Sequence, residues 1–346
     1  MSILLITAVL LLTIIQPAAA LEITAPEVPA SAQQWMPDKA DTFAEGLMEI
    51  LRDAISLLRP DIMEASGTCL GIIAAALIVS ILQTFSGSVK KTGELAGAVA
   101  ISFLLLSSTN SLIHLGAETV TELSEYGKLL LPVMTAALAA QGGITSSAAL
   151  YAGTAAFDTV LMSLIRILMI PMIYLYLAMA AANSAVGENT LKKLRDFLKW
   201  LMTWTLKIIL YVFTGYMGIT GVISGTTDAA TLKATKLTIS GMIPVVGGIL
   251  SDASETILVS AGVVKNAAGI YGILVILALC LEPCLKIGIH YLVLKAAGAI
   301  AGIFAPKSLS ELISDFSTAM GMLLAITGSV CLLLLISMVC FLKGVG

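Results

Sequence analysis

The sequence predicts an all-α protein that crosses a membrane several times, and three observations lead to this fold class. Apolar residues make up 58% of the 346 residues and charged residues only 12%, and the mean hydropathy is +1.00. These values lie far outside those of soluble globular domains. Six segments are also long and apolar enough to cross a hydrocarbon core, which takes about 20 residues per helix. Finally, Lys and Arg gather in the loops between these segments.

Residues 1–20 have the pattern of a signal peptide. An apolar core ends in Ala18-Ala19-Ala20, the small residues expected before a cleavage site. We expect cleavage after Ala20; an uncleaved anchor is the alternative, because the only positive charge before the core is the amino terminus itself. Either outcome places residues 21–66 on the extracytoplasmic side.

The segment 21–66 divides into a tether and an amphipathic helix. Residues 21–40 are rich in proline and lack periodicity, which predicts an extended tether. From residue 41 to 58, apolar residues recur at helical spacing on one face, namely at Phe43, Leu47, Ile50, Leu51, Ile55 and Leu58. This helix is expected to lie on the outer membrane surface or to dock on a partner.

Residues 67–346 form the predicted transmembrane domain. Its six apolar segments are 67–87, 93–115, 163–185, 201–224, 269–293 and 319–342. Three basic loops are assigned to the cytoplasm by the positive-inside rule, and they contain Lys90 and Lys91, then Lys192, Lys193, Arg195 and Lys199, then Lys295 and Lys307. The opposite loops are acidic or neutral, notably 117–128. With the amino-terminal segment outside, six crossings place all three basic loops inside and the carboxyl terminus outside.

Two further apolar segments, 129–153 and 241–264, are broken by proline and glycine pairs. The breaking residues are Pro132, Gly142 and Gly143 in the first segment and Pro244, Gly247 and Gly248 in the second. Shifting the sequence by 112 positions superposes Pro132 on Pro244, and also a second pair of prolines. This overlay predicts a parallel internal repeat with units 88–186 and 187–296, of the kind found in some transporters.

Each broken segment begins and ends on the outer side and is long enough for two half-helices that enter the membrane and return. Lipid cannot satisfy the backbone groups freed at the glycine pairs, so such a re-entrant hairpin must be buried in protein or line a wet cavity. A pair of short interfacial helices is the alternative.

Ionisable residues inside membrane spans are candidate functional residues because they are costly there. Glu282, Lys286 and His290 follow one another at intervals of four residues and share one helix face. They are expected to line a conduit or to dock a partner helix. The alternative is an internal Glu282–Lys286 salt bridge, with Lys286 and His290 reaching toward the cytoplasmic surface.

Four other charged residues belong to the candidate set. Asp158 and Arg166 lie at the start of the span 163–185, where they could pair with the Glu282 face. Asp252 and Glu255 lie near the tip of the second broken segment, as an ion site or as solvated loop carboxylates.

The motifs of common enzyme classes are absent from the sequence. It contains no Walker A, GxSxG or HExxH pattern and only two histidines. We therefore expect no enzyme activity, no cofactor and no metal site. The small net charge of −3 and the dispersed basic residues also argue against nucleic-acid binding.

The signal peptide, the outward amphipathic segment, the multiple spans and above all GMIPVVGGILSDASETILVSAGVVKNAAGIYG (241–272) resemble the stage III sporulation protein AE family of endospore-forming bacteria. The resemblance implies a multi-pass protein of the mother-cell membrane around the forespore. It would be one membrane subunit of a channel-like or secretion-like complex. The implied partners are other stage III sporulation A proteins, including a cytosolic secretion-type ATPase and ring-forming membrane proteins, and indirectly a forespore membrane protein.

The implied role is non-enzymatic, and no catalytic residue is carried over by the resemblance. A stand-alone secondary transporter of a small solute is the alternative function, because the predicted repeat and the broken segments are typical of that class.

Overall fold

The computed structural model describes residues 26–36, 43–84, 88–140, 144–186, 189–219 and 267–343. Within these ranges the chain is almost entirely helical and forms no strand. The helices are α2 (Ala30–Gln33), α3 (Phe43–Leu82), α4 (Ser88–Ala140), α5 (Ile144–Leu164), α6 (Ile170–Val186), α7 (Asn189–Ile219), α10 (Ala267–Phe304) and α11 (Lys307–Lys343). One π-helical turn, Ile165–Met169, joins α5 to α6. The predicted all-α class is confirmed.

Six helical stretches are long and apolar enough to cross a membrane. They are Leu58–Leu82, Thr92–Ala136, Leu150–Ala185, Leu191–Tyr216, Gly269–Phe304 and Lys307–Leu342. Each stretch overlaps one of the six segments expected from hydropathy, because a run of about 20 apolar residues has few stable alternatives to a spanning helix. The predicted number of crossings agrees with this count for the described part of the chain.

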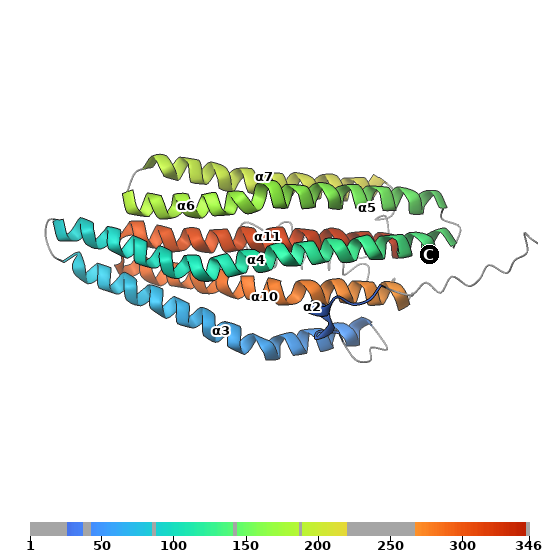
Figure 1. Cartoon of the computed structure of the whole chain (residues 1–346), viewed down its shortest axis with the longest axis horizontal. Coiled ribbons are helices and arrows are strands. Elements are labelled where there is room, and N and C mark those ends of the chain that lie inside the picture. Colours follow the sequence, from blue (N-terminus) through green and yellow to red (C-terminus); the bar gives the residue numbers. More distant parts are fainter. Residues whose placement is uncertain are drawn as a thin grey trace, which may run out of the picture.

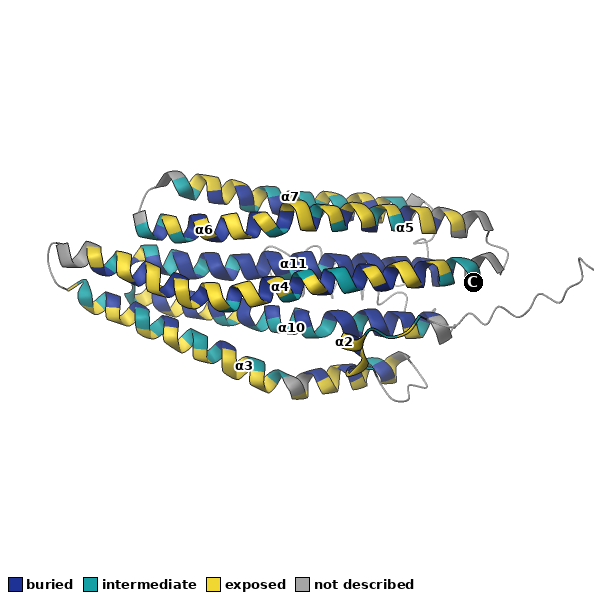
Figure 2. Cartoon of the chain, viewed as in Figure 1, coloured by how far each residue is buried: buried dark blue, intermediate teal, exposed yellow. Residues whose placement is uncertain are grey.

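α11 forms the centre of the bundle. It packs against α10, α4 and α6, while α3 packs on the outside against α10 and α4. Figure 2 shows α11 buried along nearly its whole length. Its buried Thr327 and Ser337 hydroxyls donate to backbone carbonyls one turn earlier, so the helix is covered on all sides without leaving these polar groups unsatisfied.

The helices extend well beyond one hydrocarbon core. α4 has 53 residues, which at about 1.5 Å per residue is roughly 80 Å, against about 30 Å for the apolar part of a bilayer. All the long helices lie side by side in one elongated bundle (Figure 1). α4 is therefore much longer than a single crossing of a hydrocarbon core requires.

Residues 117–128 are helical, whereas their composition predicts an outer loop. Glu118, Glu122 and Glu125 are spaced along one face of α4, and the opposite face buries Val120 and Leu123. The prediction was wrong because a stretch with three acidic residues looks like a loop by composition, although its charges fall on a single helix face.

The first broken segment does not form the separate re-entrant hairpin that was expected. Residues 129–140 continue α4, with Pro132 inside the helix, and residues 144–153 begin α5. Leu131 and Met134 on either side of Pro132 are buried in the core. This packing outweighs the single backbone hydrogen bond that the proline removes. Gly142 and Gly143 lie between the two helices, outside the described residues.

The second broken segment, with Pro244, Gly247, Gly248, Asp252 and Glu255, lies within residues 220–266, outside the described part of the chain. The parallel repeat of 88–186 and 187–296 therefore stays a prediction.

The predicted amphipathic helix and the first membrane span form one helix, α3, with Pro60 in its interior. Figure 1 shows that α3 bends along its length as it follows the bundle. An interior proline frees a backbone carbonyl and permits such a bend. The same bend brings residues near Pro60 against α10.

Candidate functional site

The amino-terminal segment packs against the bundle at α2. Ser31 donates a 2.7 Å hydrogen bond to Glu122 of α4. Gln34 Nε2 and Trp35 Nε1 donate to the same oxygen of Glu282 on α10, at 3.1 and 3.2 Å. Because Trp35 is also buried, its indole both packs against the core and satisfies a carboxylate. The expected extended tether is therefore a docked segment over residues 30–36.

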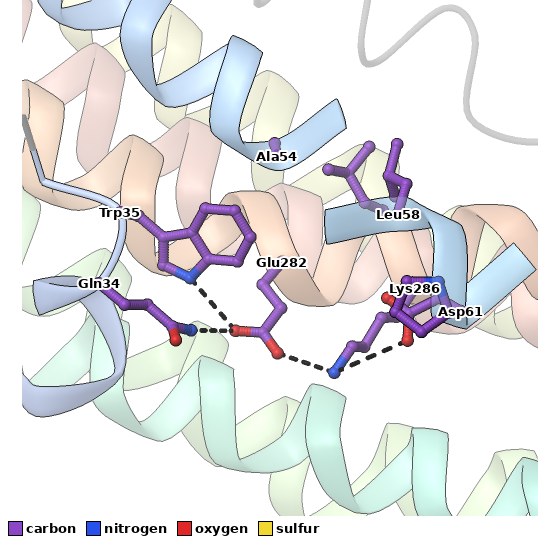
Figure 3. Close-up of a pocket in the computed structure, with 9 residues that line it drawn as sticks. Gln34, Trp35, Ala54, Leu58, Asp61, Glu282 and Lys286 are labelled. Atoms are coloured by element: carbon purple, nitrogen blue, oxygen red, sulfur yellow. Dashed lines mark hydrogen bonds and ion pairs between the residues drawn. The ribbon is translucent and has the colours of Figure 1, made fainter. Parts of the chain in front are cut away.

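Glu282 is also held from its own helix. Lys286 donates to the second Glu282 oxygen at 2.8 Å, which is the intrahelical pair expected from the four-residue spacing. Lys286 also lies 4.0 Å from Asp61 on α3. Figure 3 shows these side chains converging from α2, α3 and α10. Two carboxylates thus share one ammonium group, which leaves the cluster with a net charge of about −1.

The cluster forms one wall of a pocket with a volume of about 200 Å³. Its lining residues come from three elements: Gln34 and Trp35 beside α2, Ala54, Leu58, Pro60 and Asp61 from α3, and Glu282, Leu285 and Lys286 from α10. The pocket lining combines the indole of Trp35, the apolar side chains of Leu58 and Leu285, and an excess of negative charge. These properties suit a small polar or cationic solute.

His290 does not belong to this pocket. Its ring is buried, and Nδ1 lies 2.9 Å from the Lys286 carbonyl oxygen, within the same helix. This burial disagrees with the alternative in which His290 reaches toward the cytoplasmic surface. The face shared by Glu282, Lys286 and His290 is divided between a pocket wall and the packed interior.

Asp158 and Arg166 bind partners on α4 rather than the Glu282 face. Asp158 accepts a 2.7 Å hydrogen bond from Ser124 in the interior. Arg166 is exposed in the π-helical turn and donates to Thr121 at 3.2 Å. Among the described candidate residues, Glu282 and Lys286 are the pair whose side chains the structure brings together.

A second polar network, which sequence reasoning missed, ties α7 to α11 and α6. Arg195 on α7 is buried and forms an ion pair with Asp315 on α11. Tyr176 on α6 donates to the other oxygen of Asp315 at 3.0 Å. Nearby, Lys192 pairs with Glu311 at 3.2 Å. The opposite charges at the starts of the two spans are the signal that could have revealed it.

Gln34, Trp35 and Asp61 are the pocket residues that the sequence did not single out. A lone tryptophan in a polar tether and a carboxylate after a proline were weak signals, because both are common on exposed surfaces. Within the described ranges, no group of three His, Cys, Asp or Glu residues has the arrangement of a metal site. The five cysteines are free thiols.

The fold and its polar clusters define a multi-pass helical membrane protein with an amino-terminal segment docked onto its bundle. The family model for stage III sporulation protein AE matches residues 32–344. The chain belongs to this family, as the sequence resemblance indicated, and thus to the membrane proteins of sporulation.

A curated relative supports the same assignment. The chain is 24% identical over 258 residues to stage III sporulation protein AE of Bacillus subtilis (strain 168). The aligned region covers 73% of this chain and 64% of the relative. No solved structure matches the chain.

Proposed function

We propose that this protein is a non-enzymatic membrane subunit of a channel-like or secretion-like complex between the mother cell and the forespore. The observation that carries the proposal is the family match, which extends over nearly the whole chain, from residue 32 to 344. The protein would reside in the mother-cell membrane that surrounds the forespore, with its amino-terminal segment outside the cytoplasm.

The length of the bundle supports this role. The basic residues Lys192, Lys193 and Lys307 lie at one end of the described helices, which the positive-inside rule assigns to the cytoplasm. The roughly 80 Å length of α4 then carries the opposite end far beyond the bilayer on the outer side. A projecting helical end offers a rigid surface to membrane-anchored, ring-forming partners in the intermembrane space.

The cytoplasmic end would receive the cytosolic secretion-type ATPase. The buried Arg195–Asp315 pair and the Lys192–Glu311 pair hold the ends of α7 and α11 together there. Such ion pairs between helices give the surface a fixed shape, as a docking platform requires.

Gentle detergent extraction from sporulating cells, followed by identification and sizing of what copurifies, tests the proposal. We expect recovery in a large assembly that contains other stage III sporulation A proteins and a secretion-type ATPase. Recovery alone or as a small homo-oligomer, together with normal forespore development in a deletion strain, would overturn it. The double substitution Arg195→Asp/Asp315→Arg is a further control. It exchanges the two residues of the α7–α11 contact and still leaves opposite charges facing each other.

The pocket at Glu282 favours a second candidate function, secondary transport of a small cationic solute. Its excess negative charge and the indole of Trp35 are the specific observations. Solute uptake by the purified protein in vesicles should then be lost in Glu282→Gln and retained in Glu125→Gln, which neutralises an exposed carboxylate of α4. Absence of uptake in the unaltered protein would rule the transporter out and leave the subunit proposal intact.

A further inference from the structure

A buried carboxylate between α4 and α5 has no cationic partner in the described structure. The Asp158 residue is only 3% exposed. Its Oδ2 accepts the hydrogen bond from Ser124, but its Oδ1 has no hydrogen-bond partner. In a membrane protein, a buried carboxylate normally binds a counter-charge or serves a function.

A second unpartnered oxygen lies on the same face of α5. Thr154 precedes Asp158 by four residues, so the two side chains are neighbours on one side of the helix. Thr154 is fully buried, and its Oγ1 also has no hydrogen-bond partner. A threonine hydroxyl inside a helix commonly donates to the carbonyl one turn earlier, as those of Thr121 and Thr159 do. Thr154 does not, so its oxygen remains available to a ligand.

The charged residues that the structure describes around Asp158 form no ion pair with it. Among the described residues, the basic group whose charge acts on Asp158 is Lys128, one turn after Ser124 on α4, and its side chain is exposed. Arg166, two turns further along the chain, bonds to Thr121 instead. Asp158 and Thr154 therefore offer oxygen ligands and a negative charge, and no cationic side chain of the described residues contacts them.

We propose that Asp158, Thr154 and Ser124 hold a monovalent metal cation of the sodium class between α4 and α5. Hydroxyl and carboxylate oxygens are hard ligands that suit such an ion. One carboxylate balances a single positive charge, whereas calcium or magnesium would bring a second charge and usually binds several carboxylates or waters. The ion would link two helices of the bundle whatever partners or solutes the protein binds.

The test uses the purified full-length protein in detergent. Its thermal unfolding is followed in sodium chloride, potassium chloride and N-methylglucamine chloride at equal ionic strength. We expect the unfolding midpoint to rise saturably with sodium, by several degrees over the N-methylglucamine reference. The sodium-dependent rise should vanish in Thr154→Val and in Asp158→Asn, and it should persist in Glu125→Gln, which removes an exposed charge next to Ser124.

Thr154→Val keeps the shape of the side chain and the carboxylate, so it reports on the site even if Asp158→Asn does not fold. An unfolding midpoint that is equal in all three salts would overturn the proposal, and a water molecule would then satisfy the two oxygens. A midpoint that varies with pH because Asp158 titrates, and that does not vary with sodium, would assign a proton to the site and would also overturn the proposal. A sodium effect that survives Thr154→Val would place the cation elsewhere.

Discussion

The buried pair Arg195–Asp315 predicts an asymmetry between its two single substitutions. In Asp315→Ala the guanidinium of Arg195, whose side chain is only 5% exposed, loses its counter-charge and stays charged. Leaving one partner of a buried pair uncompensated costs about 3–5 kcal/mol. Tyr176 also loses its acceptor, which adds roughly 1 kcal/mol or more. The expected loss in the free energy of unfolding is therefore about 4 kcal/mol or more.

Arg195→Met should cause a smaller loss in the free energy of unfolding than Asp315→Ala. The carboxyl group of Asp315 can take up a proton and still accept the hydrogen bond from Tyr176, and methionine refills much of the volume of the arginine stem. We expect a loss of about 1–3 kcal/mol. The double substitution Arg195→Met/Asp315→Leu should lie close to the unaltered protein, because a well-packed apolar pair often replaces a buried ion pair without loss.

Denaturant unfolding of the detergent-solubilised protein, followed by circular dichroism, measures these differences. Asp196→Ala is the matched control, because Asp196 lies 3.7 Å from Arg195 Nε but is 62% exposed. It should cost no more than about 1 kcal/mol. Equal losses for Asp315→Ala and Arg195→Met, or a loss below that of the control, would refute the reasoning.

Three further predictions concern packing, docking and the membrane boundary. Gly97→Ala should destabilise the protein by about 1–3 kcal/mol in the same assay, because a Cβ atom there would lie 2.3 Å from a valine methyl of α3. Gly71→Ala is the control and should be neutral, because a Cβ atom at that position would have no neighbouring atom within 4 Å. Trp35→Phe keeps an aromatic ring but loses the hydrogen bond to α10, so amide exchange in residues 30–36 should quicken about fivefold, for roughly 1 kcal/mol. In that variant the remaining tryptophan fluorescence comes from Trp200 and Trp204, whose rings stack at 5.8 Å on the exposed face of α7. If this face contacts the bilayer, brominated lipids should quench the fluorescence. An unquenched signal would contradict that placement.

The number of spans was predictable from the sequence because it depends on one local property. An apolar run that enters lipid must satisfy its backbone internally, so length and hydropathy nearly determine a helix. The Glu282–Lys286 pair was predictable for a similar reason, since its four-residue spacing is fixed within one helix.

Features that depend on distant segments were not predictable. The docking of Trp35 on Glu282 joins residues 247 positions apart, and the Tyr176–Asp315 bond joins residues 139 apart. A single sequence carries no signal of which polar groups will meet across such distances. The acidic stretch 117–128 misled for a different reason, because its composition suggested a loop while its spacing was that of a helix face.

The two polar clusters differ in how easily a partner could alter them. Arg195 and Asp315 are buried, so separating them exposes an uncompensated charge and would require refolding of the interior. Trp35 and Gln34 each contribute one hydrogen bond to a partly exposed Glu282, worth about 1 kcal/mol apiece. A partner that displaces α2 must therefore offer equivalent donors and also compensate for the burial of the Trp35 indole. Displacement of α2 would therefore remove one wall of the Glu282 pocket and leave the Arg195–Asp315 contact between α7 and α11 in place.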